Sequence, residues 1–206
     1  MATGKKTVQR RDQLILATLD AIRDRGIANL RVQDVAERAG VSTGTVHYHF
    51  TDLDKLIDDV YTWACDRFYT TRLQALADIA DARDQLAAMV DAGVPRSEDD
   101  ALVIAMHDID LFRRGRPSSG PLLQALYERQ VALYFATLQL GVAQGHFRLA
   151  DPIIDIAQNL VALEDAYELH IISGNRSASP QRARELILGY ARTATGCTEL
   201  VLSPDE

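Results

Sequence analysis

The sequence predicts an all-α protein with a small three-helix domain over residues 1–52 and a larger helical bundle over residues 53–206. Apolar residues recur with the period of a helix, and helix start and stop signals punctuate the chain. Strand-like alternation and internal repeats are absent from the sequence. A chain of 206 residues is long enough for two such domains, each with its own core.

A helix, a short turn and a second helix are predicted over residues 32–50. Apolar residues occupy the i, i+3, i+4 and i+7 positions of one helical face, namely Val32, Val35, Ala36 and Ala39. Gly40 follows where a helix ends, because glycine adopts the left-handed conformation without steric cost. Ser42 can then accept a backbone N–H from the first turn of the next helix. This order of signals is typical of a helix-turn-helix.

The second of these helices has the composition of a helix that reads a DNA groove. Its residues are short or hydrogen-bonding and carry no fixed charge: Thr43, Gly44, Thr45, His47, Tyr48 and His49. Such side chains can approach base edges and phosphates, and the first-turn N–H groups favour anions. Val46 and Phe50 remain to anchor the helix inward. The alternative interpretation is a solvated turn between two core helices.

The other helices follow from caps and breakers along the chain. The first is expected to begin near Val8 and to end at Arg25-Gly26, and Asn29 can cap the next one from about Leu30. Thr51 or Asp52 can cap the helix after the groove reader. Proline, glycine and serine signals place further helices over about 95–114, 121–144, 152–173 and 180–195.

Four segments of the N-terminal part resemble the TetR family of one-component repressors. They are Arg11-Asp12-Gln13-Leu14-Ile15 with Arg25-Gly26, the run from Asp34 to Thr45, and Tyr48-His49-Phe50. The resemblance covers roughly the first 60 residues. It implies a TetR-like fold of about nine helices, a homodimer formed through the last helices, and a small-molecule effector.

The sequence departs from the family pattern at two positions that bear on phosphate contacts. Arg31 stands where the family often has Ser or Thr, which weakens capping and offers a phosphate contact instead. Leu53 holds the position of a lysine that often touches phosphate in the family, so Lys55 is the candidate to replace it. The candidate DNA-binding residues are therefore Arg31, Gln33, Ser42, Thr43, Gly44, Thr45, His47, Tyr48, His49 and Lys55.

The distribution of charge agrees with a DNA partner, although the whole chain has a net charge of −7. Residues 1–50 carry 8 Lys and Arg against 5 Asp and Glu, a net charge of +3, and the remainder has a net charge of −10. A basic head on an acidic body is attracted to phosphate through the head alone.

Composition excludes several other classes of protein. No apolar run approaches the roughly 18 residues that span a membrane, and the start has no signal-peptide core, so a cytoplasmic protein with no membrane partner is expected. Cys65 and Cys197 have no metal or redox spacing, which favours two reduced thiols. No nucleophile–base arrangement or phosphate loop is apparent, so neither an enzyme nor a cofactor is expected.

A ligand pocket in the helical bundle is predicted from large and polar side chains within apolar helices. Aromatic side chains supply the lining that small-molecule pockets use, although each can equally fill the core. The candidate ligand-binding residues are Trp63, Met106, His107, Phe112, Tyr127, Tyr134, Glu164, Tyr167 and Glu168.

Glu164 and Glu168 are one helical turn apart, so both carboxylates are expected on one face. A buried pair needs a cation, hydrogen-bond donors or protonation, which favours a cationic or polar aromatic effector. The alternatives are a solvated face or Glu–Arg pairs across a dimer. A metal site that also uses His107, Asp108 and His170 is a weaker hypothesis.

The function predicted from these patterns is that of a homodimeric repressor that binds operator DNA and is released by a small molecule. An activator, or a repressor that requires its ligand, would have the same sequence features, and a metal-responsive regulator is a further alternative. An enzyme on a helical bundle and a non-specific DNA-packaging protein are the rival classes. The acidic body argues against the packaging protein.

Overall fold

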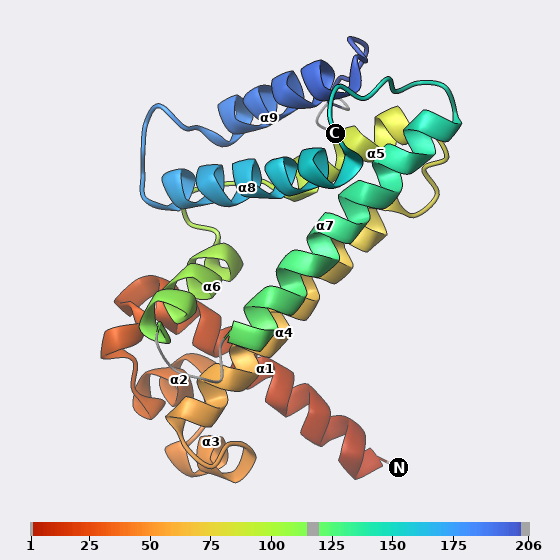
Figure 1. Cartoon of the computed structure of the whole chain (residues 1–206). Coiled ribbons are helices and arrows are strands. Elements are labelled where there is room, and N and C mark those ends of the chain that lie inside the picture. The colour runs from red at the N-terminus through yellow and green to blue at the C-terminus, as the bar shows by residue number, and fades with distance from the viewer. Residues whose placement is uncertain (1, 115–119, 203–206) are drawn as a thin grey trace. The chain divides into compact units, whose positions relative to one another are not determined.

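The computed structural model describes residues 2–114 and 120–202, with side chains from residue 9 onward, and confirms the all-α class (Figure 1). Every regular element within these ranges is a helix. The described residues form two compact units. The first consists of residues up to 67 together with 101–114, and the second of residues 68–100 together with 120–202.

The first unit contains the helix-turn-helix. Its elements are α1 (Ala2–Arg25), the 3-10 turn η1 (Ile27–Asn29), α2 (Val32–Ala39), α3 (Thr43–His49), the first part of α4 (Leu53–Leu76) and α6 (Ala101–Phe112). Helix α1 packs against α2 and α6, and α2 packs against α3. The core of this unit includes Leu14, Ile15, Ile22, Val35 and Leu56, all at most 1% exposed.

The second unit is a bundle built on α7 and α8. Its elements are the remainder of α4, α5 (Ala82–Ala92), α7 (Gly120–Ala143), α8 (Ile153–Ile172) and α9 (Pro180–Thr195). Helix α7 packs against α5 and α8, and α8 also packs against α9. Apolar side chains from α5, α7, α8 and α9 meet in one core, which includes Leu86, Leu138, Leu160 and Ile187.

This division differs from the boundary predicted after residue 52, because α4 contributes to both units and α6 joins the first. Two polar contacts hold α6 against the first part of α4. The Tyr61 hydroxyl donates to Asp110, and the Arg113 guanidinium pairs with Asp58. Burial raises the pKa of Asp110, although the hydroxyl of Tyr61 opposes this rise. These contacts join residues about 50 apart in sequence, so sequence spacing gives no sign of them.

Some helix starts were predicted wrongly. Helix α1 begins at Ala2 rather than near Val8, and α6 begins at Ala101 rather than near residue 95. Asn29 lies in η1 and donates its side-chain amide to the Arg25 carbonyl at 3.2 Å, so it does not cap α2. The Arg31 N–H instead donates to Asp34 at 2.9 Å, and α2 begins one residue later.

Other helix ends follow the sequence prediction. Ser179 caps α9, with Pro180 as its first residue, and Asp52 accepts the Lys55 N–H at 2.7 Å at the start of α4. Gly145 follows α7 with φ 77°. None of the helices in the described ranges is long and apolar enough to cross a membrane.

Candidate nucleic-acid interface

The turn between α2 and α3 is built by the two residues that the sequence singled out. Gly40 has φ 65° and ψ 37°, a left-handed conformation that carries the chain out of α2. The Ser42 hydroxyl accepts the backbone N–H of Thr45 at 3.2 Å, which satisfies a first-turn donor of α3. The predicted helix-turn-helix is therefore confirmed, with its stop and cap at the expected residues.

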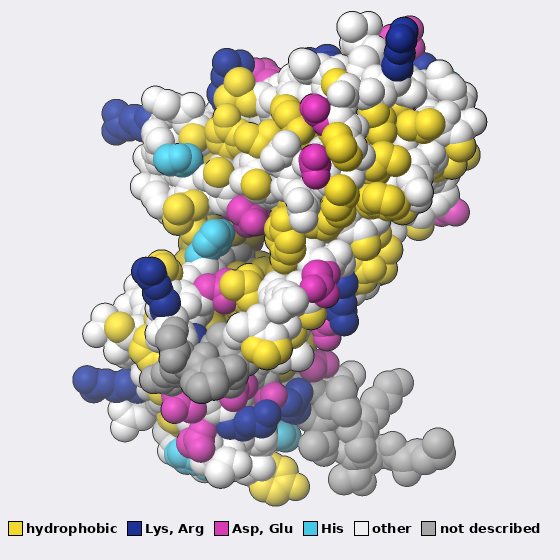
Figure 2. All heavy atoms as spheres, viewed as in Figure 1, with side chains coloured by type: hydrophobic (Ala, Val, Ile, Leu, Met, Phe, Trp, Pro, Cys, Tyr) yellow, Lys and Arg dark blue, Asp and Glu magenta, His cyan; other side chains and the backbone are white. Residues whose placement is uncertain are grey.

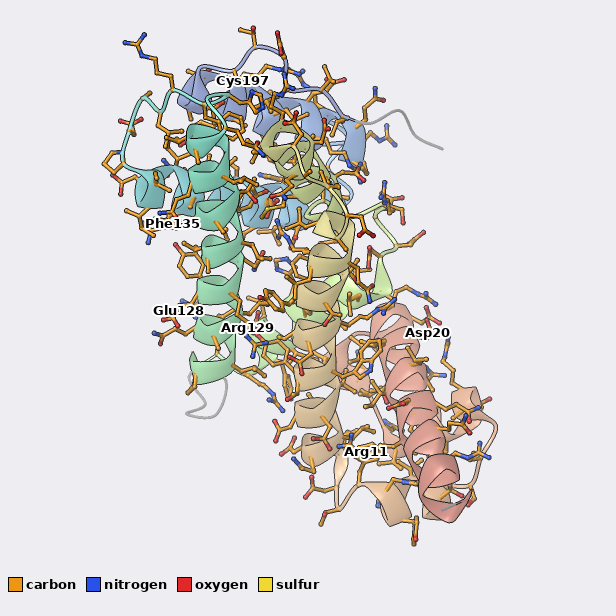
Figure 3. The ribbon with its side chains drawn as sticks, turned by 90° about the vertical axis from the view of Figure 1, so that its right-hand side faces the viewer. Arg11, Asp20, Glu128, Arg129, Phe135 and Cys197 are labelled. Carbon is orange, nitrogen blue, oxygen red and sulfur yellow. The ribbon has the colours of Figure 1, made fainter. Side chains whose placement is uncertain are left out.

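Two apolar residues fix α3 to the first unit. Val46 and Phe50 are each 2% exposed, as their positions in the sequence predicted. The Arg11 guanidinium carbon lies 5.3 Å from the centre of the Phe50 ring, and its Nη2 pairs with Asp59 at 2.6 Å. Arg11 extends from α1 near the first part of α4 (Figure 3). This arginine therefore supports the end of α3 through a cation–π contact, a role that the sequence analysis missed.

The outer face of α3 presents hydrogen-bonding side chains to solvent. Tyr48 is 81% exposed, and Thr43 and His47 are exposed as well. Thr45 and His49 are half-buried, and the His49 ring meets the edge of Tyr48 at 5.2 Å between centroids. A tyrosine exposed to this extent contributes little to a core, so its ring is available to a partner.

A surface depression lies where the start of α2 meets α3. It has a volume of about 400 Å³ and is lined by Arg31, Val32, Gln33, Thr43 and His47. Four of these five residues are predicted DNA contacts, and the fold brings them together although they are up to 16 positions apart. One guanidinium, one amide, one hydroxyl and one imidazole on a concave surface can bind phosphate and base edges.

Lys55 lies in the first turn of α4, where its ammonium pairs with Asp59 at 3.1 Å. Its side chain is 56% exposed, and exposed ion pairs contribute little to stability. A phosphate can therefore replace Asp59 as the partner of Lys55 at small cost.

The predicted ligand-binding residues are divided between the two units. Trp63, Met106, His107 and Phe112 belong to the first unit, and Tyr127, Tyr134, Glu164, Tyr167 and Glu168 belong to the second. Within the second unit the Tyr134 hydroxyl donates to Glu164, so these two residues meet. Tyr127 and Tyr167 are half-buried and pack at the margin of the bundle core.

Glu164 and Glu168 are buried, which rules out a fully solvated face of α8 for this pair. The Arg72 guanidinium reaches both oxygens of Glu164 at 2.8 Å, so the chain itself supplies the cation that a buried glutamate needs. Burial raises the pKa of Glu164, whereas the charge of Arg72 and the hydroxyl of Tyr134 lower it. The net result is a pKa raised to about 7.

Arg72 was missed by the sequence analysis, although a signal for it exists. Leu56, Val60, Ala64 and Phe68 form a buried stripe with a spacing of four residues, and Arg72 continues that stripe. A charged residue at the next position of a buried stripe indicates a buried charge with a partner elsewhere in the chain.

No group of three or more side chains able to hold a metal ion occurs among the described residues. His107 and Asp108 lie on α6 in the first unit, whereas Glu164, Glu168 and His170 lie on α8 in the second. The ring of exposed His170 contacts the Asn175 amide, with 3.2 Å between the two nitrogens.

Known bacterial regulators resemble this chain in sequence. The family model for bacterial regulatory proteins of the tetR family matches residues 14–60. The HTH-type transcriptional regulator BetI 1 of Chromohalobacter salexigens is 30% identical over 211 positions, covering 91% of this chain and 90% of that protein. The HTH-type transcriptional repressor KstR2 of Mycolicibacterium smegmatis is 23% identical over 154 positions, covering 75% and 74%.

Solved structures share the fold over nearly the whole chain. A transcriptional regulator from Saccharomonospora viridis in complex with choline has a TM-score of 0.83 at 22% identity, covering 91% of this chain and 98% of that one.

The two relatives described above are named transcriptional regulators and not enzymes, in agreement with the expectation for this chain. Residues 14–60 are those that build α2, α3 and their supports, and the BetI 1 match extends over both units. The chain therefore belongs to the TetR family of bacterial transcriptional regulators.

Proposed function

We propose that this transcriptional regulator is a repressor that binds operator DNA as a homodimer and leaves it when a small molecule binds the second unit. The observation that carries the proposal is the exposed face of α3, where a tyrosine 81% exposed stands above two anchors that are 2% exposed. The buried side of such a helix is held in place by the core, and its exposed side is available to a partner.

The depression beside α3 supports binding in a major groove. Arg31 and Gln33 enter it from α2, and Thr43 and His47 enter it from α3. Arginine binds phosphate or guanine, glutamine binds adenine, and small hydroxyl side chains adapt to either partner. The same surface would serve an activator, so the choice of a repressor rests on relatives such as KstR2, which is named a repressor.

A homodimer is proposed because one helix-turn-helix reads too few base pairs to specify a genomic site, and paired heads read half-sites about 34–36 Å apart. The exposed face of α8 suits this role. Ala162, Ala166 and Leu169 follow one another at helical spacing and are exposed, and Leu169 is 47% exposed. Figure 2 shows hydrophobic side chains gathered on the part of the second unit that carries α7 and α8.

The effector is proposed to bind in the second unit, among aromatic side chains such as half-buried Tyr127 and Tyr167. The choline complex of the Saccharomonospora viridis protein favours an organic cation. The Glu164 carboxylate already has Arg72 as its cation, so we place such an effector at other residues.

An unbiased selection from random duplexes at moderate ionic strength tests the proposal. We expect enrichment of a palindromic sequence, because a twofold dimer reads two copies of one half-site. Binding to it should weaken steeply as salt is raised, because phosphate contacts release counterions. Failure to enrich any sequence would contradict operator binding, and enrichment of a single half-site would contradict the dimer.

A further inference from the structure

Arg72 is the largest fully buried side chain of the described residues, and it lies in the part of α4 that belongs to the second unit. Removing a guanidinium from water is costly unless the protein supplies replacements for its hydration. Burial alone lowers the pKa of Arg72, but the opposing charge of Glu164 raises it above its ordinary value. The arginine is therefore charged, and its surroundings must hold a cation.

Three helices other than α4 contribute the acceptors. Glu164 on α8 accepts from Nη2 through both carboxylate oxygens, each at 2.8 Å. Gln130 on α7 accepts from Nη1 at 2.7 Å, and the Met89 carbonyl on α5 lies 3.4 Å from Nη2. The remaining donor, Nε, has no hydrogen-bond acceptor among the described residues, so the contacts are concentrated at the terminal nitrogens.

Aromatic rings complete the surroundings of the cation. The guanidinium carbon lies 5.4 Å from the centre of the Tyr134 ring and 5.6 Å from that of Phe68. Tyr134 also donates its hydroxyl to Glu164, which orients the carboxylate. A carboxylate with rings within cation–π distance is the chemistry by which proteins recognise organic cations.

Gly93, which follows α5, leaves the space that this carboxylate occupies. A methyl group at Gly93 would lie 2.1 Å from Oε1 of Glu164, far inside contact distance. The carboxylate cannot move aside freely, because Arg72 and Tyr134 both hold it. The backbone at the end of α5 and the side chains of α7 and α8 are thus fitted together around the Arg72 guanidinium.

We propose that Glu164, Gln130, Tyr134 and the Met89 carbonyl form a guanidinium-binding site, and that Arg72 is the chain's own ligand, which anchors the C-terminal part of α4 to α5, α7 and α8.

The C-terminal part of α4 is mostly exposed, which supports the anchoring role of Arg72. Between Phe68 and Leu76, only Phe68 and Arg72 are buried, and Leu73 is 42% exposed. A second contact is peripheral: Arg129 of α7 extends toward α4 (Figure 3), and its guanidinium carbon lies 5.3 Å from the Tyr69 ring centre. Apolar attachment of this part of α4 is limited to buried Phe68 and to Leu76, which is half-buried against the bundle core, so the buried ion pair contributes much of what holds it.

The anchoring has a consequence for regulation, which rests on the proposed function. Three residues separate the end of α3 from the start of α4, which runs without interruption to the guanidinium site. An effector that favours a conformer in which Arg72 is displaced would therefore change the constraint on the helix that follows the DNA reader. The binding site itself can be tested without DNA and without an effector.

The decisive experiment is chemical rescue of Arg72→Ala, measured at pH 8 and above. Loss of Arg72 removes a charge that lowers the pKa of Glu164, so the rescue should strengthen as the pH is raised. Ethylguanidinium replaces the atoms that this substitution removes beyond Cβ, and ethylurea is its neutral counterpart. We expect backbone amides 72–76 of the variant to exchange hydrogen about tenfold faster or more than in the natural chain. Millimolar ethylguanidinium should slow that exchange and raise the melting temperature, and ethylurea should do neither.

Two further variants keep the experiment interpretable. Arg72→Met fills the space without charge, so it should show the same fast exchange without rescue, and it serves if Arg72→Ala does not fold. Adding Glu164→Gln to Arg72→Ala should abolish the rescue, because the carboxylate is the principal acceptor.

Arg184→Ala is the matched control. Arg184 is also buried, pairs with Asp91 at 2.7 Å and donates to the Val94 carbonyl at 3.1 Å, but lies on α9. Its loss should lower the melting temperature and leave exchange of amides 72–76 unchanged. Unchanged exchange in Arg72→Ala would overturn the anchor, and equal rescue by ethylurea, or none by ethylguanidinium, would overturn the cation site. None of these results depends on whether the chain binds an operator.

Discussion

Tyr48 and Glu164 are two residues whose positions relative to the protein surface determine what each can do. Tyr48 is 81% exposed on α3, where its hydroxyl and ring can meet a partner. Glu164 is fully buried on α8, where its charge depends on Arg72 and Tyr134. Substitution of the first should change binding, and substitution of the second should change stability.

We predict that Tyr48→Ala abolishes binding to the selected operator and changes the unfolding free energy by about 0.5 kcal/mol or less, because the side chain buries little surface. Fluorescence anisotropy and urea unfolding measure the two quantities. Leu111→Ala removes another hydrophobic side chain of the first unit, 65% exposed, and should leave DNA affinity unchanged. A parallel loss of affinity and stability in Tyr48→Ala would make Tyr48 a structural residue instead.

Glu164 should make stability depend on pH in a defined direction. Its pKa is raised by burial from 4.5 to about 7, so its protonated form is favoured in the folded state. A raised pKa contributes stability that is present below about pH 4.5 and is lost as the pH rises through about 7. Between pH 5 and 8 the natural chain should therefore lose stability relative to Glu164→Gln, by about 3 kcal/mol at most. Urea unfolding at each pH gives the difference in unfolding free energy between the natural chain and Glu164→Gln. A difference that does not change with pH would show that the pKa of Glu164 is not raised by folding.

At the scale of the element, α3 is a helix of seven residues that depends on its ends. A helix this short is unstable alone, so the cap at Ser42 and the buried anchors Val46 and Phe50 must hold it. The same ends set the direction in which Thr43 and His47 face the depression beside α2.

We predict that Ser42→Ala lowers the unfolding free energy by about 1 kcal/mol, because the Thr45 N–H loses its acceptor. Operator affinity should fall as well, since the first turn of α3 frays. Ser42→Asn, which keeps a capping oxygen, is the control and should retain most of the stability. If Ser42→Ala and Ser42→Asn unfold at the same urea concentration, the cap contributes nothing to the fold.

At the scale of the whole molecule, helix α4 is part of both units, and the proposed dimer would pair two such chains. The exposed residues Ala162 and Ala166 on α8 are small, so another helix could approach closely there. A charged side chain at the centre of such a contact would be desolvated without a partner.

Ala166→Glu should therefore weaken the dimer at least about tenfold in dissociation constant, which corresponds to roughly 1.4 kcal/mol. Sedimentation velocity over a range of concentrations measures this change. Ala132→Glu makes the same substitution at an exposed position of α7 and should leave the dimer intact. An unchanged association state in Ala166→Glu would place the interface elsewhere.

Much of the helix-turn-helix was predictable because its determinants are local. The conformational freedom of Gly40, the capping oxygen of Ser42 and the apolar anchors Val46 and Phe50 act over a few residues, and each has its predicted place. Helix starts such as those of α1 and α6 were less predictable, because a weak terminal turn gains or loses residues according to what packs against it.

The sequence by itself determined the helical class, the helix-turn-helix and the family, because periodicity, capping and backbone sterics are properties of neighbouring residues. Only the tertiary structure decided which residues share an environment. Arg72 and Glu164 are 92 positions apart, and the pairing that neutralises Glu164 exists because α4 and α8 are packed in one unit. Burial and long-range electrostatics depend on that packing, so the charges were visible in the sequence but their partners were not.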